Sequence, residues 1–230
     1  RDQLAGYIAS QVSDPALLAK VVPDYPPFGT RMLQDDGTWL STLAREDVEL
    51  VPSGVARVTE RGLVADDGTQ VDVDAIVWAT GFDVGRLPSI DLVGRGGRRL
   101  SEAWGDEPKL HLGITIPGFP NHFMIVGPNT GVLHSGNLII VSECQVNYIL
   151  DGIRRLVEET DVLDCRPAVA DAYHGKLAAE LAGSVFAKVP SYFSNAAGKV
   201  VVCMPWPLAD YWRWTRQVDP MDFEARPADR

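Results

Sequence analysis

Several patterns that identify common classes of protein are missing from this sequence. Its 230 residues include three cysteines, Cys144, Cys165 and Cys203, without a CxxC pair, so we expect neither a disulfide framework nor a metal site. No apolar run reaches the roughly 18 residues of a transmembrane helix. HExxH, P-loop and Ser-His-Asp patterns are also absent. The sequence therefore predicts a cytoplasmic protein that has no membrane segment.

Positive charge is scarce as well. The chain has 21 Lys and Arg residues against 31 Asp and Glu residues, a net charge of −10. Such a surface repels phosphate backbones, so a nucleic-acid partner is not expected. We interpret the short basic run 95–99 as a solvated turn. The first residues, 1–4, do not resemble a signal peptide, and the chain reads as a continuation of something longer.

Short-range signals predict helices and a small sheet in the first third. Apolar spacing indicates two helical pieces, with Asp14 as a cap and Pro15 in a first turn. The proline-rich stretch 22–31 is expected to be a rigid extended loop. Strands are predicted at 48–51, 55–59, 62–65 and 70–73, with a turn at Asp66-Asp67-Gly68.

Further along, continuous apolar runs indicate buried strands. Ala75–Ala79 and 122–126 are typical of strands that are buried on both faces of a parallel sheet, and 111–116 is a plausible strand. Residues 83–108 read as loop. Helical spacing predicts a long helix at 136–159, capped by Ser135 or Asn137, and a second helix at 168–182.

Two glycine-containing loops are candidate ligand sites. Ala79-Thr80-Gly81 follows a predicted strand, and ligands in open α/β sheets collect beyond the carboxyl ends of strands. Gly127-Pro-Asn-Thr-Gly131 precedes the long helix, where unpaired N–H groups and the helix dipole favour an anion. Ordinary connecting turns remain the alternative for both loops.

One arginine and two histidines complete the set of candidates. Arg31 ends the proline-stiffened loop and would hold an anion there, although a surface arginine is the alternative. His122 precedes a predicted buried strand, and His134 lies in the loop before the long helix. We interpret His134 as a loop histidine, with a position facing a cofactor as the alternative.

Taken in order, several blocks resemble the Baeyer–Villiger monooxygenases. These blocks are 23–31, 43–51, 74–83, 118–130 and 142–149. The late blocks 194–199, 205–212 and 215–220 are most similar to the 4-hydroxyacetophenone monooxygenase branch. Any one block is weak evidence, but five in the expected order are specific.

The resemblance implies an α/β fold that is the C-terminal part of a flavoprotein with two Rossmann-like dinucleotide-binding domains. Both GxGxxG fingerprints of such an enzyme are absent, so the fold would be incomplete without the N-terminal half. Residues 1–82 would be the C-terminal part of the NAD(P)-binding domain. Residues 83–230 would be the C-terminal part of the FAD-binding domain.

The implied chemistry uses FAD and NADPH to insert one oxygen atom of O₂ next to the carbonyl of a ketone, giving an ester or lactone. Arg31 matches the active-site arginine, a fixed cation where negative charge develops. The implied cofactor contacts are Thr30, Ala79, Thr80, Gly81, Phe82, Gly127, Pro128, Asn129, Thr130 and Tyr192.

Two departures from the family pattern concern the cofactor contacts. Thr30 stands where the family has a lysine that contacts the NADPH phosphate, and Tyr192 replaces a tryptophan. Two alternative functions remain open: a monooxygenase that hydroxylates nitrogen or sulfur, and a truncated chain that binds no flavin by itself.

Overall fold

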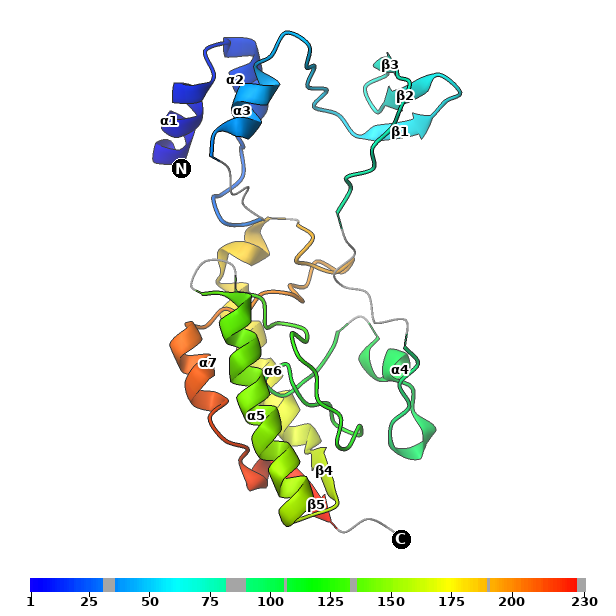
Figure 1. Ribbon diagram of the computed structural model, residues 1–230, viewed down its shortest axis with the longest axis vertical. Coiled ribbons are helices and arrows are strands. Elements are labelled where there is room, and N and C mark those ends of the chain that lie inside the picture. The colour runs from blue at the N-terminus through cyan, green and yellow to red at the C-terminus, as the bar shows by residue number, and fades with distance from the viewer. Residues whose placement is uncertain (31–35, 82–89, 106, 133–135, 190, 227–230) are drawn as a thin grey trace. The chain divides into compact units, whose positions relative to one another are not determined.

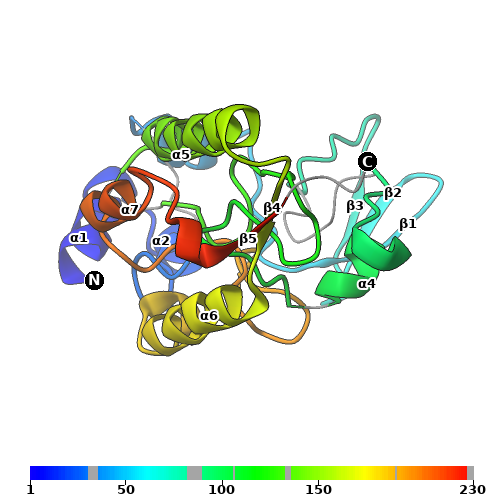
Figure 2. The ribbon, with the colours of Figure 1, turned by 90° about the horizontal axis from the view of Figure 1, so that it is seen from below.

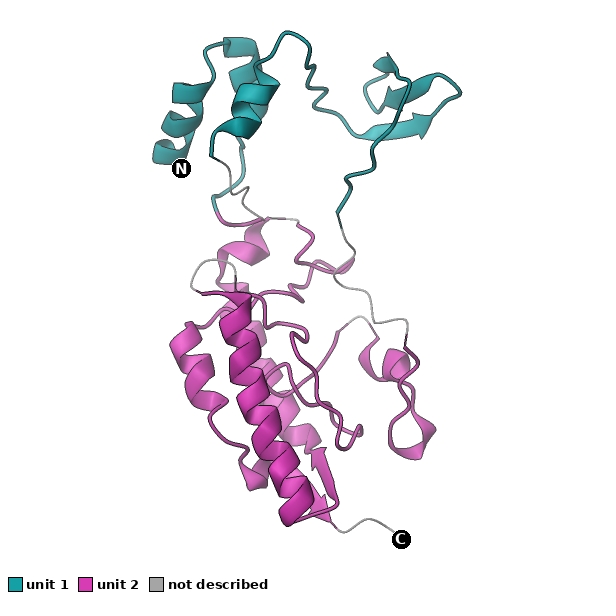
Figure 3. Ribbon diagram, in the orientation of Figure 1, with its two compact units in different colours: residues 1–27, 32–82 teal, residues 28–31, 83–230 magenta. Residues whose placement is uncertain are grey.

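The chain divides into two compact units. The computed structural model describes residues 1–30, 36–81, 90–105, 107–132, 136–189 and 191–226 (Figure 1). The first unit comprises Arg1–Pro27 and Met32–Phe82, and the second comprises Phe28–Arg31 and Asp83–Arg230 (Figure 3). Which nucleotide each unit binds stays a prediction.

Three short helices open the first unit: α1 (Asp2–Gln11), α2 (Pro15–Val21) and α3 (Thr38–Leu43). The Asp14 side chain accepts a hydrogen bond from the N–H of Ala16 at 2.9 Å, so the predicted cap of α2 is confirmed. Helix α3 was not predicted. It begins after Gly37, whose left-handed φ of 98° reverses the chain there.

A three-stranded antiparallel sheet follows in the order β1 (Val55–Val58), β2 (Gly62–Ala65) and β3 (Gln70–Asp72). Gly68 adopts a φ of 89° in the turn between β2 and β3, and its N–H donates to the carbonyl of Ala65. The three predicted strands and their turn are confirmed. These strands were predictable because the signals for a hairpin, a turn sequence and alternating apolar residues, extend over only a few neighbouring residues.

Two predicted strands of the first unit are wrong. Residues 48–51 form no strand, and neither do Ala75–Ala79. Val77 is 88% exposed and Trp78 is 62% exposed, so this run is not buried. An apolar run indicates a segment whose side chains are stabilised by burial. A strand forms only where the backbone of a neighbouring segment pairs with it. The described residues supply no such neighbour.

The second unit places two long helices on either side of a strand pair. Helices α5 (Leu138–Glu158) and α6 (Pro167–Ala182) lie on opposite sides of the β4–β5 pair (Figure 2). Strands β4 (Val162–Cys165) and β5 (Phe223–Arg226) are antiparallel. The predicted long helices are confirmed, as is Asn137 as the cap of α5.

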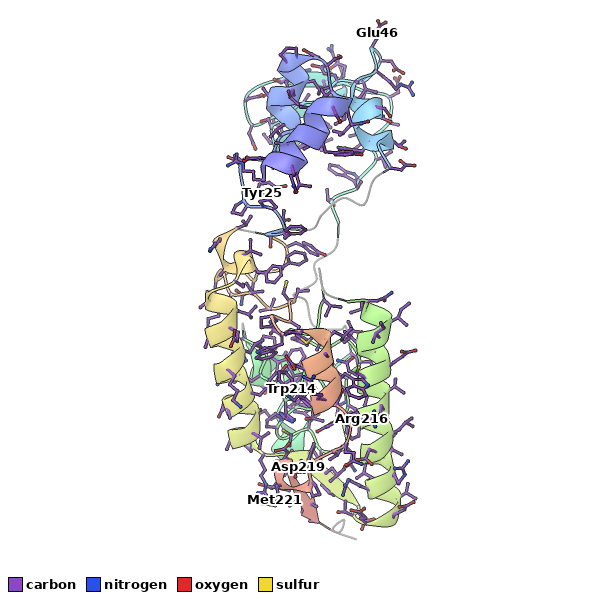
Figure 4. All side chains as sticks on the ribbon, turned by 90° about the vertical axis from the view of Figure 1, so that its left-hand side faces the viewer. Tyr25, Glu46, Trp214, Arg216, Asp219 and Met221 are labelled. Atoms are coloured by element: carbon purple, nitrogen blue, oxygen red, sulfur yellow. The ribbon has the colours of Figure 1, made fainter. Side chains whose placement is uncertain are left out.

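Shorter elements of the second unit were not predicted. They are the helices α4 (Leu100–Trp104) and α7 (Leu208–Trp214), the 3₁₀ turns η1 (Arg95–Gly97), η2 (Val185–Lys188) and η3 (Pro220–Asp222), and both strands. Helix α4 corrects the expectation that 83–108 is all loop. Helix α7 packs against α5, and Trp214 and Arg216 mark its C-terminal end (Figure 4).

Aromatic and aliphatic side chains form the core of the second unit. Its main cluster joins α5, β4, β5 and α7 through fully buried residues that include Val141, Tyr148, Tyr211 and Phe223. A second cluster surrounds α4, and a third joins α6 to the segment around Phe193. This core holds the loop that precedes α5.

Two further predicted strands are replaced by bends. Residues 111–116 form a tight turn in which the N–H of His111 donates to the carbonyl of Thr115 at 2.9 Å, and Leu112 and Gly113 have positive φ angles. The 122–126 segment makes one isolated bridge, from Phe123 to Thr115. Ile125 and Val126 are 51% and 42% exposed, so this apolar run is not buried on both faces as predicted.

Candidate functional site

The Gly127–Gly131 loop lies in the second unit between the 122–126 segment and α5. Asn129 is buried and adopts a left-handed φ of 57°. Its side-chain amide donates to the carbonyls of Val200 and Cys203 at 2.9 and 3.2 Å, and its backbone N–H donates to Val201. These bonds offset the cost of the left-handed backbone, so the Asn129 side chain anchors the loop from inside.

Thr130 closes the loop on itself. Its side chain is fully buried, and its hydroxyl donates to the carbonyl of Gly127 at 2.6 Å. The next residue, Gly131, forms a parallel bridge with Cys203, in which Met204 N–H donates back to Gly131 at 2.8 Å. The loop is therefore tied at several points to the 200–204 segment.

Close packing against Gly113 explains why residue 127 of the loop is a glycine. A Cβ atom on Gly127 would collide with the carbonyl oxygen of Gly113, and one on Gly113 would collide with the side chain of Thr130. Glycine at 127 is thus required by contact between two loops of the protein itself.

A buried glutamine that was not predicted, Gln145, links the residue before this loop to Tyr211 and Leu112. The Gln145 side-chain oxygen accepts from Val126 N–H at 2.8 Å, and its amide donates to the Tyr211 hydroxyl at 2.9 Å. That hydroxyl donates in turn to the carbonyl of Leu112 at 2.7 Å. Gln145 and Tyr211 are both fully buried, and burial raises the pKa of Tyr211, which keeps it protonated.

The helical spacing of α5 could have predicted that Gln145 is buried. It follows Val141 by four residues and precedes Tyr148 by three, so it lies on the buried face. A polar side chain at such a position needs partners, because an unpaired buried amide costs about 1–3 kcal/mol.

Backbone donors remain for a ligand at the loop. Within the described part of the chain, the N–H groups of Gly127 and Thr130 have no hydrogen-bond acceptor. The first turn of α5 adds a positive dipole end, although Asn137 caps the N–H of Ile139 at 2.8 Å. Any contact of the loop with an anion would come from backbone N–H groups, since its polar side chains face inward.

The other predicted site residues of the second unit lie apart from this network in sequence. Thr30 is half-buried. Tyr192 is 38% exposed and packs on Phe193, with ring centroids 4.4 Å apart. Arg31, His134 and Ser135 lie outside the described residues, as does Phe82 of the first unit, so what was predicted for them stays a prediction.

The predicted site residues of the first unit are exposed. Ala79, Thr80 and Gly81 form no strand or helix, and Gly81 has a φ of 85°. Within the residues that the structure describes, none of the three makes a hydrogen bond to another side chain. The role of this tripeptide as a cofactor contact stays a prediction.

One buried histidine of the second unit has a strongly lowered pKa. Burial lowers the pKa of His111 to about 4, although Nε2 lies 3.3 Å from the Asp222 carboxylate. Desolvation disfavours the charged imidazolium more than this neighbouring carboxylate favours it. Burial also raises the pKa of Asp222. His111 is thus neutral at physiological pH.

Neither membrane nor metal features arise in the described ranges. No helix there combines the length and the apolar character needed to cross a bilayer. No three or more His, Cys, Asp or Glu side chains gather there in a way that could hold a metal ion.

No family model matches this sequence. Individual proteins do. The chain is 36% identical to an uncharacterized monooxygenase, y4iD, of Sinorhizobium fredii over 99% of its own length and 35% of that protein. It is 35% identical to a Baeyer–Villiger monooxygenase of Streptomyces coelicolor over 96% of its length and 43% of that protein. The chain is homologous to part of the Baeyer–Villiger monooxygenases.

The fold agrees with this homology. The structure of OTEMO in complex with FAD and NADP superposes with a TM-score of 0.85 at 25% identity, over 97% of this chain and 43% of that one. The α/β fold is therefore that of a portion of a Baeyer–Villiger monooxygenase, consistent with its C-terminal portion. The chain spans less than half the length of the relatives that it matches.

Proposed function

We propose that this chain is the C-terminal part of a flavin-dependent monooxygenase that uses FAD and NADPH to insert one atom of O₂ next to a ketone carbonyl. The observation that carries the proposal is 35% identity to a Baeyer–Villiger monooxygenase over 96% of the chain. The reactants would be a small ketone and O₂, and the product an ester or lactone.

The Gly127–Thr130 loop fits a role in holding FAD. Its backbone is anchored by Asn129, while the N–H groups of Gly127 and Thr130 have no acceptor among the described residues. Donors of this kind suit the phosphate or the anionic edge of a flavin. Gln145 and Tyr211 would keep the loop in this conformation before the cofactor binds.

When bound, FAD would supply the oxygen-activating redox chemistry, and the chain would orient the reactants and exclude water. Arg31 would provide a fixed positive charge where negative charge develops on the reacting oxygen atoms. Thr30 and Tyr192 would contact the nicotinamide cofactor, and Ala79–Phe82 would also contact a cofactor.

Flavin binding is the first test. The purified chain is titrated with FAD, alone and together with the part of the Streptomyces coelicolor relative that the chain does not match. Visible flavin absorbance that co-purifies with the protein, followed by ketone-dependent NADPH consumption, would support the proposal. A mixture that folds but never retains flavin would refute it.

The role of Arg31 has its own test. In a flavin-loaded assembly, Arg31→Ala should lower the rate of ester formation by at least about 100-fold, the scale of a lost charge-stabilising group. The matched control is Arg98→Ala, an exposed arginine that should leave the rate unchanged. Full ester formation by Arg31→Ala would remove this residue from the mechanism.

The proposal also concerns which ketone is oxidised and which nicotinamide nucleotide is used. Similarity of the late blocks to the 4-hydroxyacetophenone branch supports an aryl ketone as the first substrate to assay. Analysis of the products separates an ester from an N- or S-oxide. Thr30→Lys should shift the preference toward NADPH over NADH, because lysine pairs with the additional phosphate.

A further inference from the structure

Helix α5 is apolar on two opposite faces. Its buried face contains Val141, Cys144, Gln145, Tyr148 and Gly152. A second set of aliphatic side chains is exposed, namely Ile139 (67%), Val146 (40%), Leu150 (56%), Ile153 (45%) and Val157 (80%). At about 100° per residue these five positions align on one side of the helix, opposite its buried face. We call this set the outward stripe.

The neighbouring helix shows that such a stripe is unusual here. Helix α6 exposes alanine, glycine, proline and charged residues, and its large aliphatic side chains Leu177 and Leu181 are buried. That is the ordinary pattern of a helix with one face in water. In Figure 4, side chains of α5 project away from α6 and α7 as well as toward them. The contrast indicates that the outer side of α5 is adapted to a covering layer.

The same unit exposes a second apolar feature next to α5. The N–H of Val126 donates to Gln145, which places the 122–126 segment directly beside the helix. Ile125 and Val126 are about half exposed, in a run whose sequence is typical of a strand covered on both faces. This segment adjoins the buried side of α5, where Gln145 lies, so it is a second apolar patch separate from the outward stripe. Exposed apolar surface of either kind marks interaction sites, since each large side chain that becomes fully buried contributes about 1.5–3 kcal/mol.

We propose that the outward stripe of α5 is the docking surface for the part of the monooxygenase that the relatives possess and this chain does not match. This inference rests on the proposed function. The chain corresponds to 35–43% of each of the two relatives, so more than half of such an enzyme has no counterpart here. The occupant would present an aliphatic face, because the stripe itself carries no charge.

Association without flavin tests the inference separately from the enzyme activity. The unmatched part of the Streptomyces coelicolor relative is made as a separate polypeptide, and its binding to the chain is measured by sedimentation velocity. Leu150→Lys should weaken binding at least about tenfold, a loss near 1.4 kcal/mol. Glu158→Gln is the matched control, because it changes the charge by the same amount at an exposed position of α5 outside the stripe.

A fused protein gives a second measurement that does not depend on the separate polypeptide folding alone. The unmatched part is joined ahead of this chain, and thermal unfolding is compared with that of the chain by itself. Leu150→Lys should lower the Tm of the fused protein by several degrees. It should leave the Tm of the isolated chain nearly unchanged, because Leu150 is exposed there.

Three results would overturn the inference. Equal binding of Leu150→Lys and Glu158→Gln would place the contact elsewhere. Self-association of the chain that Leu150→Lys abolishes would make a second copy the occupant. An unchanged Tm in both proteins would leave the stripe uncovered. If docking occurs but the flavin-loaded complex oxidises no ketone, the proposed function fails and the docking surface stands.

Discussion

Buried side chains are distributed unequally between the two units. The second unit has three hydrophobic clusters, with Phe193, Tyr211 and Phe223 almost fully buried. In the first unit, helices α1 and α2 bury no residue at all, and β1 is exposed along its whole length. Packing of apolar side chains supplies most of the free energy that holds a fold. The second unit therefore has its own source of stability, whereas the described part of the first buries only a few apolar side chains, among them Val12, Leu40 and Ala65.

The largest expected effect tests that contrast directly. Phe193→Ala should lower the free energy of unfolding by about 3–5 kcal/mol, because it opens a cavity in the cluster with Leu177 and Phe186. Val58→Ala, on the exposed strand β1, should cost less than about 1 kcal/mol. Urea unfolding followed by tryptophan fluorescence measures both. Comparable losses would mean that the first unit contributes equally to the core.

Acid should destabilise the second unit through His111. The pKa of this residue is about 4 in the folded chain and about 6.5 when unfolded, so the unfolded state binds more protons between these values. Stability should thus fall as the pH drops from about 6.5 to 4, by up to roughly 3 kcal/mol. Asp222, whose pKa is raised, works in the opposite direction.

His111→Gln isolates the histidine in that experiment. The variant keeps a polar side chain and cannot titrate in this range, so its stability should vary less between pH 4 and 6.5. Urea unfolding at several pH values measures the difference between the variant and the unchanged chain. An identical slope for the two proteins would show that another group is responsible.

A smaller effect is expected at the buried glutamine. Gln145→Leu should cost about 1–3 kcal/mol, because the half-exposed Val126 N–H and the buried Tyr211 hydroxyl each lose a hydrogen-bond partner. Hydrogen exchange should also become faster at that N–H. Gln11→Leu is the control in the first unit, since Gln11 is exposed and should change stability by less than about 0.5 kcal/mol. Unaltered exchange at Val126 would disprove the anchoring role.

The smallest effect is expected in the apolar run of the first unit. Val77→Ser should change the stability of the isolated chain by less than about 0.5 kcal/mol, because Val77 is 88% exposed. Thermal unfolding measures this change. A loss above about 1 kcal/mol would show that the 75–79 run is covered, and the contrast between the units would then be weaker.

Features determined over a few neighbouring residues were predictable from sequence. The spacing of α5, its Asn137 cap, and the Asp66–Gly68 turn between β2 and β3 are examples. Each rests on hydrogen bonds within one turn or one hairpin, so the rest of the chain has little influence on it. The position of the Gly127–Gly131 loop belongs to this group, because glycine and proline interrupt regular structure locally.

Tertiary structure alone decided which apolar runs found partners and which way the loop side chains point. The apolar runs at 75–79 and 122–126 predict buried segments. Whether such a run forms a strand depends on a neighbouring strand, which the residues of the run itself do not determine. The side chain of Asn129 bonds to residues 71 and 74 positions away in the sequence. The side chain of Gln145 bonds to residues 19 and 66 positions away. Such contacts exist only once distant segments have packed together, so the sequence by itself located the candidate site and the fold determined how it is built.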